Sequence, residues 1–416
     1  MVIGQGGREH ALAWRLSLSE SVTYLCSAPG NPGMEQLGPV FAVDPVDPQA
    51  VVALAQAQQI DLAVVGPEAP LVAGVADALR QAGIAVFGPD ASGAQIEASK
   101  TFAKQVMADA NVATAGSVTA TTVDEAYTAL QRFGSPYVVK ADGLAQGKGV
   151  TVTTSHDEAK RAVDAALTEK VFGEAGTTLV VEAFLDGPER SVFGVCDGTD
   201  VVLLAPAQDY KRAYDADEGP NTGGMGAYSP VAGFDLDDVT GLTDTVFRPV
   251  LAALRHRGTT FRGLLYAGIV VTSAGPKLLE FNARFGDPET QVIMPRLTGD
   301  FAALLYAAAT GHVTDVPVSF STDAAVTVAL TSSGYPGSYT TGKVITGIED
   351  AESDPHVVVF HAGTARRNDG ALVTNGGRVL NVTATGSDRD TARERAYAAV
   401  AKIRFDGVAF RRDIAR

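Results

Sequence analysis

Residues 137–152 read YVVKADGLAQGKGVTV, and the order of strand formers and glycines in this stretch decides the fold class. An apolar run leads into Lys140, and a second β-branched run closes the stretch. The loop between the two runs contains Gly143, Gly147, Lys148 and Gly149. A P-loop needs G-x-x-x-x-G-K-[ST] followed by a helix, and neither condition is met. The stretch therefore predicts a β-hairpin whose backbone amides can cover a triphosphate, with Lys140 as a fixed charge beneath it.

A second informative stretch is PKLLEFNARFGDPET, residues 276–290. Side chains alternate along a strand, so we expect Glu280, Asn282 and Arg284 to share one face. A carboxylate and an amide oxygen suit Mg²⁺, which takes few protein ligands and completes its shell with phosphates and water. The neighbouring arginine can clamp a phosphate or a carboxylate. An ordinary amphipathic strand with a wet face remains the alternative.

The segment TLVVEAFLDGPERSVF, residues 178–193, is predicted to be a buried strand whose polarity changes at Glu182. Backbone groups from Glu182 to Leu185 can hydrogen-bond an adenine edge, while Phe184 and Leu185 pack against its faces. Glu189 can accept hydrogen bonds from ribose hydroxyls. The alternative is a strand that ends in an Asp-Gly turn.

Residues 208–230 read QDYKRAYDADEGPNTGGMGAYSP, and their turn formers predict a long loop without regular periodicity. Loops of this length in compact domains are usually functional or mobile. Asp209, Lys211 and Arg212 offer charge, and residues 221–226 allow close backbone approach, as a small polar substrate requires. A solvated loop without function is the alternative.

Residues 2–90 alternate short apolar runs with helix-period segments. We expect strands near 2–4, 22–26, 62–65 and 85–88, and helices near 8–18, 48–59 and 71–82, which together predict a parallel sheet. GQGGREH follows the first strand, and Gly4, Gly6 and Gly7 can admit a small phosphate at a helix N-terminus. The dinucleotide pattern G-x-G-x-x-G fails because Glu9 stands at its last glycine. A plain strand-to-helix turn remains possible.

The rest of the chain completes the outline. A helix over residues 91–112 is expected to carry Lys100 and Lys104, and a helix capped by Asp300 is expected to end at Gly311. Residues 313–319, VTDVPVS, are a plausible linker. From Ala324 onward we expect short strands and then a helix from about 389 to 402, with no catalytic constellation and with His356 and His361 in structural roles.

Composition and charge limit the function classes. Hydrophobic residues make up 46% of the 416 residues, which predicts a globular protein. The net charge of −15 and the lack of a basic stripe disfavour a nucleic-acid surface. The sequence has no apolar run long enough for a membrane span and no signal peptide pattern, so we expect a cytoplasmic protein without a membrane partner. The two cysteines, Cys26 and Cys196, do not suggest a disulfide framework.

These segments together resemble the phosphoribosylamine-glycine ligase family of the ATP-grasp enzymes. The resemblance runs over the whole chain in one collinear series. Its motifs are GGREHAL, APGN, VGPEAPLVAG, FGP, KADGLAQGKGV, FLDG, GPNTGGMGAYSP, EFNARFGDPETQ, GYPG, FHAGT and TNGGRVL.

The resemblance implies a multidomain α/β and α+β fold. Its parts are a doubly wound parallel-sheet domain for substrate at 1–98, an ATP-grasp core at 99–312 with a lid at about 113–187, and a mixed β-rich domain at 313–416. It also implies ligation of glycine to 5-phosphoribosylamine through a glycyl phosphate, with ATP and Mg²⁺ or Mn²⁺. The partners expected are these small molecules alone, and the expected state is a monomer or weak dimer.

The same resemblance implies roles for individual residues. Lys100 and Lys140 contact ATP phosphates under the loop at 143–149, and Lys140 and Arg284 support catalysis. Adenine lies at residues 182–185, ribose at Glu189, and the metal at Glu280 and Asn282. The sugar phosphate lies near Gly6 and Gly7. The remaining substrate contacts are assigned to Glu68, Asp209, Lys211 and Arg284.

Two departures from the family pattern and three rival functions accompany this interpretation. Family members usually carry a few more residues before the first Val-Ile-Gly, which suggests an upstream start, and Ala183 and Pro188 replace acidic residues often seen beside the adenine site.

The rival functions are carboxylation of an aminoimidazole ribonucleotide with bicarbonate, a nucleotide-binding module without turnover, and a nicotinamide oxidoreductase.

Overall fold

The computed structural model describes residues 1–144 and 149–416, and its N-terminal part contains a small parallel sheet. The strand order is β2 (Ser27–Pro29), β1 (Val2–Gly4), β3 (Leu62–Val65) and β4 (Ala85–Phe87), all parallel. The helices of this part are α1 (Gly7–Ser17), α2 (Pro48–Ala57), α3 (Glu68–Val72), α4 (Val75–Gln81) and α5 (Ala91–Ala98). The predicted parallel sheet is confirmed.

Three boundaries in this part differ from the prediction. The strand expected near 22–26 begins only at Ser27, because β1 first offers a pairing partner at Val2. The helix expected at 71–82 is two helices, α3 and α4, separated at Gly74, which has a φ of +84°. The helix expected at 91–112 is also two, because Ser99 caps the start of α6 (Lys100–Asp109) by accepting a hydrogen bond from the Phe102 amide.

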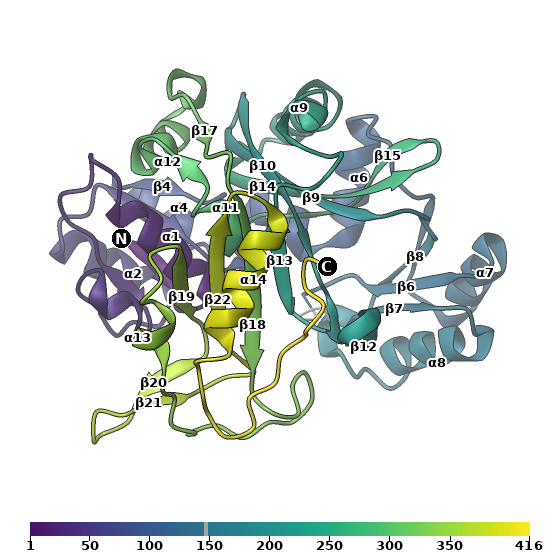
Figure 1. Ribbon diagram of the computed structural model, residues 1–416. Coiled ribbons are helices and arrows are strands. Elements are labelled where there is room, and N and C mark those ends of the chain that lie inside the picture. Colours follow the sequence, from purple (N-terminus) through teal and green to yellow (C-terminus); the bar gives the residue numbers. More distant parts are fainter. Residues whose placement is uncertain (145–148) are drawn as a thin grey trace.

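A separate four-stranded antiparallel sheet follows and carries the glycine hairpin (Figure 1). Its order is β5 (Ser117–Ala120), β8 (Leu179–Ala183), β6 (Tyr137–Ala141) and β7 (Val150–Thr153), and α7 (Val123–Phe133) and α8 (His156–Leu167) pack on it. The pairing of β6 with β7 confirms the predicted hairpin. Gly147 and Lys148 of its loop lie outside the described residues.

The largest sheet has eight antiparallel strands and joins the middle of the chain to its C-terminal part. Its order is β15 (Gly275–Asn282), β14 (Arg262–Thr272), β9 (Glu189–Asp197), β10 (Val201–Asp209), β13 (Gly226–Ser229), β18 (Ala324–Thr331), β22 (Arg378–Gly386) and β19 (Val357–His361). Since β13 pairs with β18, the sheet runs without a break past residue 313.

Shorter elements surround this sheet. The helices are α9 (Leu236–Val239), α10 (Arg248–His256), α11 (Thr290–Ile293), α12 (Phe301–Thr310), α13 (Ile348–Ala351) and α14 (Arg389–Val400), and the strand pairs are β11 (Arg212–Tyr214) with β12 (Glu218–Asn221), β16 (Leu297–Thr298) with β17 (Ser319–Phe320), and β20 (Thr364–Arg366) with β21 (Leu372–Thr374). Asp300 caps α12 and Gly311 ends it in the left-handed conformation, as predicted.

Two predictions about the middle of the chain are wrong. Residues 178–193 are not one strand: β8 ends at Ala183 in the four-stranded sheet, and β9 begins at Glu189 in the eight-stranded sheet. The Asp-Gly-Pro turn at 186–188 separates them, so the segment links the two sheets. Residues 208–230 are not an irregular loop, because they form the β11–β12 hairpin and strand β13. The backbone groups of residues 208–230 find their hydrogen-bond partners in these strand pairs, which the abundance of turn formers in the sequence did not reveal.

The N-terminal and C-terminal parts meet through two buried histidines, both in structural positions. The amide of His361 on β19 donates a 2.8 Å hydrogen bond to Nδ1 of His10 on α1, and the His361 Nδ1 lies 3.1 Å from the Thr364 hydroxyl. Burial lowers the pKa of His10 to about 3, with His361 adding to the shift, and burial lowers the pKa of His361 to about 4, with Arg366 adding to it.

We expect this pair to make the protein acid-sensitive. The unfolded histidines take up protons near pH 6.5 while the folded ones stay neutral to about pH 4, so the free energy of unfolding falls as pH drops through this window, by up to about 1.4 kcal/mol per pH unit for each histidine. His10→Asn retains an acceptor for the His361 amide but does not titrate, so it should remove about half of the slope. Urea denaturation between pH 4.5 and 7 measures this slope, and an unchanged slope in the variant would contradict the assignment.

Candidate active site

Two lysines share one buried carboxylate beside the glycine hairpin. Lys140 lies on β6, and its Nζ is 2.9 Å from one oxygen of Glu182 on β8. Lys104 on α6 places its Nζ 3.0 Å from the other oxygen. The side chains of Glu182 and Lys140 are only 2% and 5% exposed. The Glu182 carboxylate is therefore committed to these cations, and its backbone lies in β8, which pairs with β5 on one side and β6 on the other.

Lys100 lies at the first turn of α6, close to the base of the hairpin. Its Nζ is 3.5 Å from the Gly143 carbonyl, and the amide of the next residue, Thr101, donates a 2.6 Å hydrogen bond to Asp142. Burial lowers the pKa of Lys100, and Lys140 lowers it further, while Glu280 opposes both. At the other end of the loop, the Gly149 carbonyl accepts from Ala141. The hairpin base is thus tied to the helix that carries two of the lysines.

Glu280 and Asn282 lie two residues apart on β15, on the same face, as predicted. Burial would raise the pKa of Glu280, but Lys211, Lys140, Lys100 and Arg284 lower it below its ordinary value. Glu280 is therefore ionised at neutral pH. An anionic oxygen beside an amide oxygen, both half-buried, is a donor set that fits a hard divalent cation with phosphate ligands. In the described part of the chain, no group of three His, Cys, Asp or Glu side chains forms a metal site.

Arg284 lies beyond the end of β15, which stops at Asn282, so the strand itself carries only the first two of the three predicted residues. The position of Arg284 is fixed by Phe285, whose ring packs between Phe87 and Phe301 at centroid distances of 5.8 and 6.2 Å. The guanidinium reaches two carboxylates, at 2.9 Å from Glu97 and 3.4 Å from Glu68.

These carboxylates set the charge of the Arg284 pocket. Burial opposes the charge of Arg284, but Glu97 and Glu68 raise its pKa. Burial also raises the pKa of Glu97, although Arg284 acts to lower it. At Glu68 burial acts to raise the pKa, but Arg284 and Arg8 outweigh burial and the pKa is lowered. Arg284 Nε is buried and lacks a hydrogen-bond partner among the described residues.

Asp209, Lys211 and Glu189 form a third charged group, near the end of β10. Lys211 Nζ lies 2.6 Å from Glu189, and both side chains are more than a third exposed. Burial raises the pKa of Asp209 to about 7, with Glu289 and Glu189 adding to the shift and Lys211 opposing it. The Asp209 carboxyl can therefore exchange a proton near neutral pH. Glu189, the predicted ribose contact, is paired with Lys211 here.

The predicted adenine segment lies on the link between the two sheets. The Phe184 side chain is 43% exposed, and the half-buried Leu185 follows it. The Ala183 amide is used by a 2.9 Å hydrogen bond to the Gly116 carbonyl. Phe184 and Leu185 therefore offer apolar contact next to the lysine pair, and the adenine and ribose roles stay predictions.

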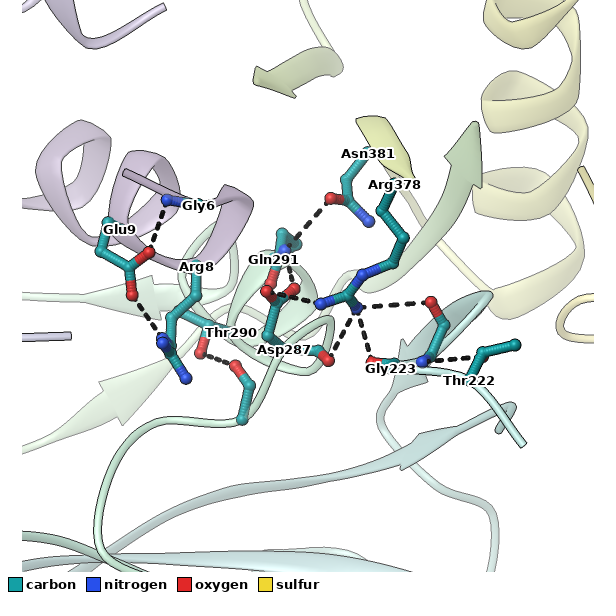
Figure 2. Close-up of polar contacts among 12 residues, drawn as sticks. Gly6, Arg8, Glu9, Thr222, Gly223, Asp287, Thr290, Gln291, Arg378 and Asn381 are labelled. Carbon is teal, nitrogen blue, oxygen red and sulfur yellow. Dashed lines mark hydrogen bonds and ion pairs between the residues drawn. The ribbon is translucent and has the colours of Figure 1, made fainter. Parts of the chain in front are cut away.

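Gly6 and Gly7 lie at the start of α1, where Glu9 folds back on the turn (Figure 2). The Gly6 amide donates a 2.6 Å hydrogen bond to Glu9, which also pairs with Arg8 at 2.5 Å. At Gly7 a Cβ would lie 2.6 Å from Asn381 Oδ1 and 2.8 Å from Gln291 Nε2, so a larger residue would have to displace these two side chains. Gln291 Oε1 and Asn381 Nδ2 are buried and have no partner within the described ranges. These polar atoms border the turn at which the sugar phosphate is predicted.

Sequence reasoning missed several residues of this site. Lys104 stands one helical turn after Lys100, and this i, i+4 spacing could have revealed it. Glu97 precedes Ala98 and Ser99, and no sequence motif at this position identifies it as a site residue. Glu289 is 3% exposed and accepts from Tyr266 at 2.9 Å and from Ser191 at 3.3 Å. These partners come from distant strands, which a single sequence does not pair.

Lysines under a glycine hairpin, facing a glutamate and an asparagine on a second sheet, define a site that can hold a nucleoside triphosphate with its cation. This places the protein in the ATP-grasp class, and residues 98–290 match the family described as "Phosphoribosylglycinamide synthetase, ATP-grasp (A) domain". Residues 1–97 match the N domain of the same family and residues 325–416 its C domain. The chain belongs to the phosphoribosylglycinamide synthetase family.

Individual relatives agree with this placement. The chain is 54% identical to the phosphoribosylamine–glycine ligase of Streptomyces coelicolor, over 100% of this chain and 98% of the relative, and 47% identical to that of Mesorhizobium japonicum over 100% and 97%. The crystal structure of phosphoribosylamine–glycine ligase from Thermotoga maritima superposes with a TM-score of 0.86 at 33% identity, covering 99% and 98% of the two chains.

A more distant likeness concerns the fold alone. Biotin carboxylase from Campylobacter jejuni has a TM-score of 0.75 at 15% identity, covering 98% of this chain and 92% of that chain. The multidomain α/β architecture predicted from the sequence is thus confirmed. No helix among the described residues is both long enough and apolar enough to cross a membrane.

The paired lysines lead to a stability prediction. Replacement of Glu182 by Gln leaves Lys104 and Lys140 buried without a counter-charge, which should lower the free energy of unfolding by about 3–5 kcal/mol. Glu189→Gln is the matched control, because the exposed pair with Lys211 should contribute only about 0–1 kcal/mol. Chemical denaturation at pH 7 measures both, and equal losses would contradict the structural role of Glu182.

Proposed function

We propose that this protein ligates glycine to 5-phosphoribosylamine in an ATP-dependent reaction that yields glycinamide ribonucleotide, ADP and phosphate, a step of de novo purine biosynthesis. The observation that carries the proposal is the Glu280 carboxylate, whose pKa four cations from separate segments lower: Lys100, Lys140, Lys211 and Arg284. A group of cations around one anionic oxygen donor is suited to a triphosphate and to the carboxylate that it activates. The relatives named phosphoribosylamine–glycine ligase support the choice of substrates.

The chemistry requires activation because a carboxylate repels an incoming amine and oxide is a poor leaving group. In the proposed first step a glycine carboxylate oxygen attacks the γ-phosphorus of ATP, and the bond from this phosphorus to the β-phosphate oxygen breaks. Lys140 and Arg284 stabilise the charge on the transferring phosphoryl group. Glu280 and Asn282 would hold the Mg²⁺ or Mn²⁺ ion, which would supply charge neutralisation for the phosphates.

In the second step the amine nitrogen attacks the carbonyl carbon of glycyl phosphate, the carbon–oxygen bond to phosphate breaks, and the nitrogen releases a proton. Asp209 is the proposed acceptor for that proton, since its pKa near 7 suits exchange at neutral pH. An acyl phosphate hydrolyses readily, so the hairpin that begins at Gly143 is proposed to exclude water before transfer.

The remaining roles form one proposed arrangement. ATP phosphates contact Lys100, Lys140 and the 143–149 loop, adenine lies at 182–185, and ribose lies at Glu189. Glycine meets Arg284, and the sugar phosphate lies at Gly6 and Gly7, with Glu68, Asp209 and Lys211 nearby. A parallel-sheet domain at 1–98, a core at 99–312 with a lid at 113–187, and a domain at 313–416 remain the proposed division. A monomer or weak dimer remains the proposed state.

The first test is ADP release with Mg²⁺, ATP, glycine and freshly generated 5-phosphoribosylamine, with each component omitted in turn. We expect turnover only when glycine and the amine are both present, because glycine forms the acyl phosphate and the amine consumes it. ATP consumption that ignores glycine but requires bicarbonate would favour the carboxylase, and ATP binding without turnover would favour a binding module.

The metal assignment has its own test. Glu280→Ala with Asn282→Ala removes both oxygen donors, so ADP release should fall at least about 100-fold and lose its normal dependence on Mg²⁺ concentration. Asp406→Ala, which removes a largely exposed carboxylate paired with Lys343 in the C-terminal part, is the control, and we expect its activity to stay within about twofold. A double variant with normal turnover and normal metal dependence would overturn the assignment.

A further inference from the structure

Arg378, the first residue of β22, holds two loops of the site together from the C-terminal part of the chain (Figure 2). Its Nη1 donates to the carbonyls of Gly223, Gly224 and Asp287 at 2.6, 3.3 and 2.9 Å. Its Nη2 lies 2.9 Å from the Asp287 carboxylate. Both side chains are less than a fifth exposed. A single guanidinium therefore joins the segment after β12 to the segment after β15.

Both loops carry residues of the proposed reaction. The Thr222 amide and hydroxyl donate to the Lys211 carbonyl at 2.7 and 2.8 Å, so the 222–224 turn is fixed to the backbone of Lys211. Asp287 comes three residues after Arg284. The two loops also touch, because a Cβ on Gly224 would lie 2.3 Å from Pro288, and Gly224 has a φ of +110°. A shift of one loop must therefore move the other.

The Asp287 carboxylate is held on both oxygens and faces the N-terminal glycine turn. Arg378 binds one oxygen, and Gln291 Nε2 donates to the other at 2.7 Å. A Cβ on Gly6 would lie 3.9 Å from Asp287 Oδ2, and Gln291 also borders Gly7. The clamp of Arg378 thus extends through Asp287 and Gln291 to the turn at which the sugar phosphate is proposed to bind.

We infer that Arg378 is a positioning residue for the phosphoribosyl half of the site, with no direct part in ATP binding. The inference rests on the proposed function. The planar fork of arginine serves three carbonyls and a carboxylate at fixed angles, whereas a lysine at this position can keep the ion pair with Asp287 but cannot span all the carbonyls. Loss of the fork leaves the 222–224 and 285–289 loops free to separate, and the ribonucleotide then has to order them on binding.

The test uses glycinamide ribonucleotide, the stable product, as the probe in isothermal titration calorimetry with the full chain. Arg378→Gln should raise the Kd for glycinamide ribonucleotide by about tenfold or more, while the Kd for ATP with Mg²⁺ should change less than about twofold. The Kd of Arg378→Lys for glycinamide ribonucleotide should lie between the values for Arg378→Gln and wild type. Asp287→Asn should also weaken binding of glycinamide ribonucleotide. In the double variant Arg378→Gln/Asp287→Asn, the loss of binding free energy should be smaller than the sum of the two single losses, because both changes remove the same clamp.

Arg393→Gln is the matched control for loss of a carbonyl clamp elsewhere. Arg393 donates to the Ile414 and Arg412 carbonyls at 2.9 Å each, at the C-terminal tail. The Arg393→Gln substitution should lower Tm without changing the Kd for glycinamide ribonucleotide or the Kd for ATP with Mg²⁺. The inference is overturned if Arg378→Gln binds glycinamide ribonucleotide as wild type does, or if it weakens ATP and glycinamide ribonucleotide equally. Should Arg378→Gln fail to fold, Arg378→Lys decides by the same criterion. A wild-type protein that fails to bind glycinamide ribonucleotide overturns the proposed function as well.

Discussion

Charge compensation at the junction of the two antiparallel sheets is the constraint on which the rest of the structure depends. Lys104, Lys140 and Arg284 bring positive charges into largely buried positions. Without counter-charges, burial of Lys104 and Lys140 would be prohibitively unfavourable. Glu182 satisfies both lysines, and Glu97 and Glu68 do the same for Arg284. The carboxylates thus allow a cationic site to be folded and ready before its substrates arrive.

This compensation explains why the site is divided between sheets. The Glu182 end belongs to the four-stranded sheet with the glycine hairpin, whereas Glu280 belongs to the edge strand of the eight-stranded sheet. The turn at 186–188 links β8 to β9, and Thr114, just ahead of β5, bridges to Leu278 on β15, so two segments join the halves.

The C-terminal part of the chain is built into the site as well as into the fold. Strands β18, β22 and β19 complete the large sheet. The backbone amide of His361 on β19 donates to His10 and so anchors α1 to this sheet. Arg378 and Asn381 on β22 reach the loops around Asp287 and the N-terminal glycines. Residues separated by more than 350 positions in the sequence are thereby held at one place, which rigid, densely paired strands achieve better than loops.

The sequence by itself determined the parallel N-terminal sheet, the glycine hairpin, the capped helix at Asp300 and the shared face of Glu280 and Asn282. Each of these depends on local patterning, such as residue alternation along a strand or a cap beside a helix. Only the tertiary structure decided that residues 178–193 divide between two sheets and that residues 208–230 form a hairpin and a strand. It also decided that Arg284, just beyond β15, meets Glu97 and Glu68. The same holds for the partners of Glu182 and Arg378. The physical reason is that strand pairing and charge compensation join groups from distant segments, and local sequence does not specify which segments meet.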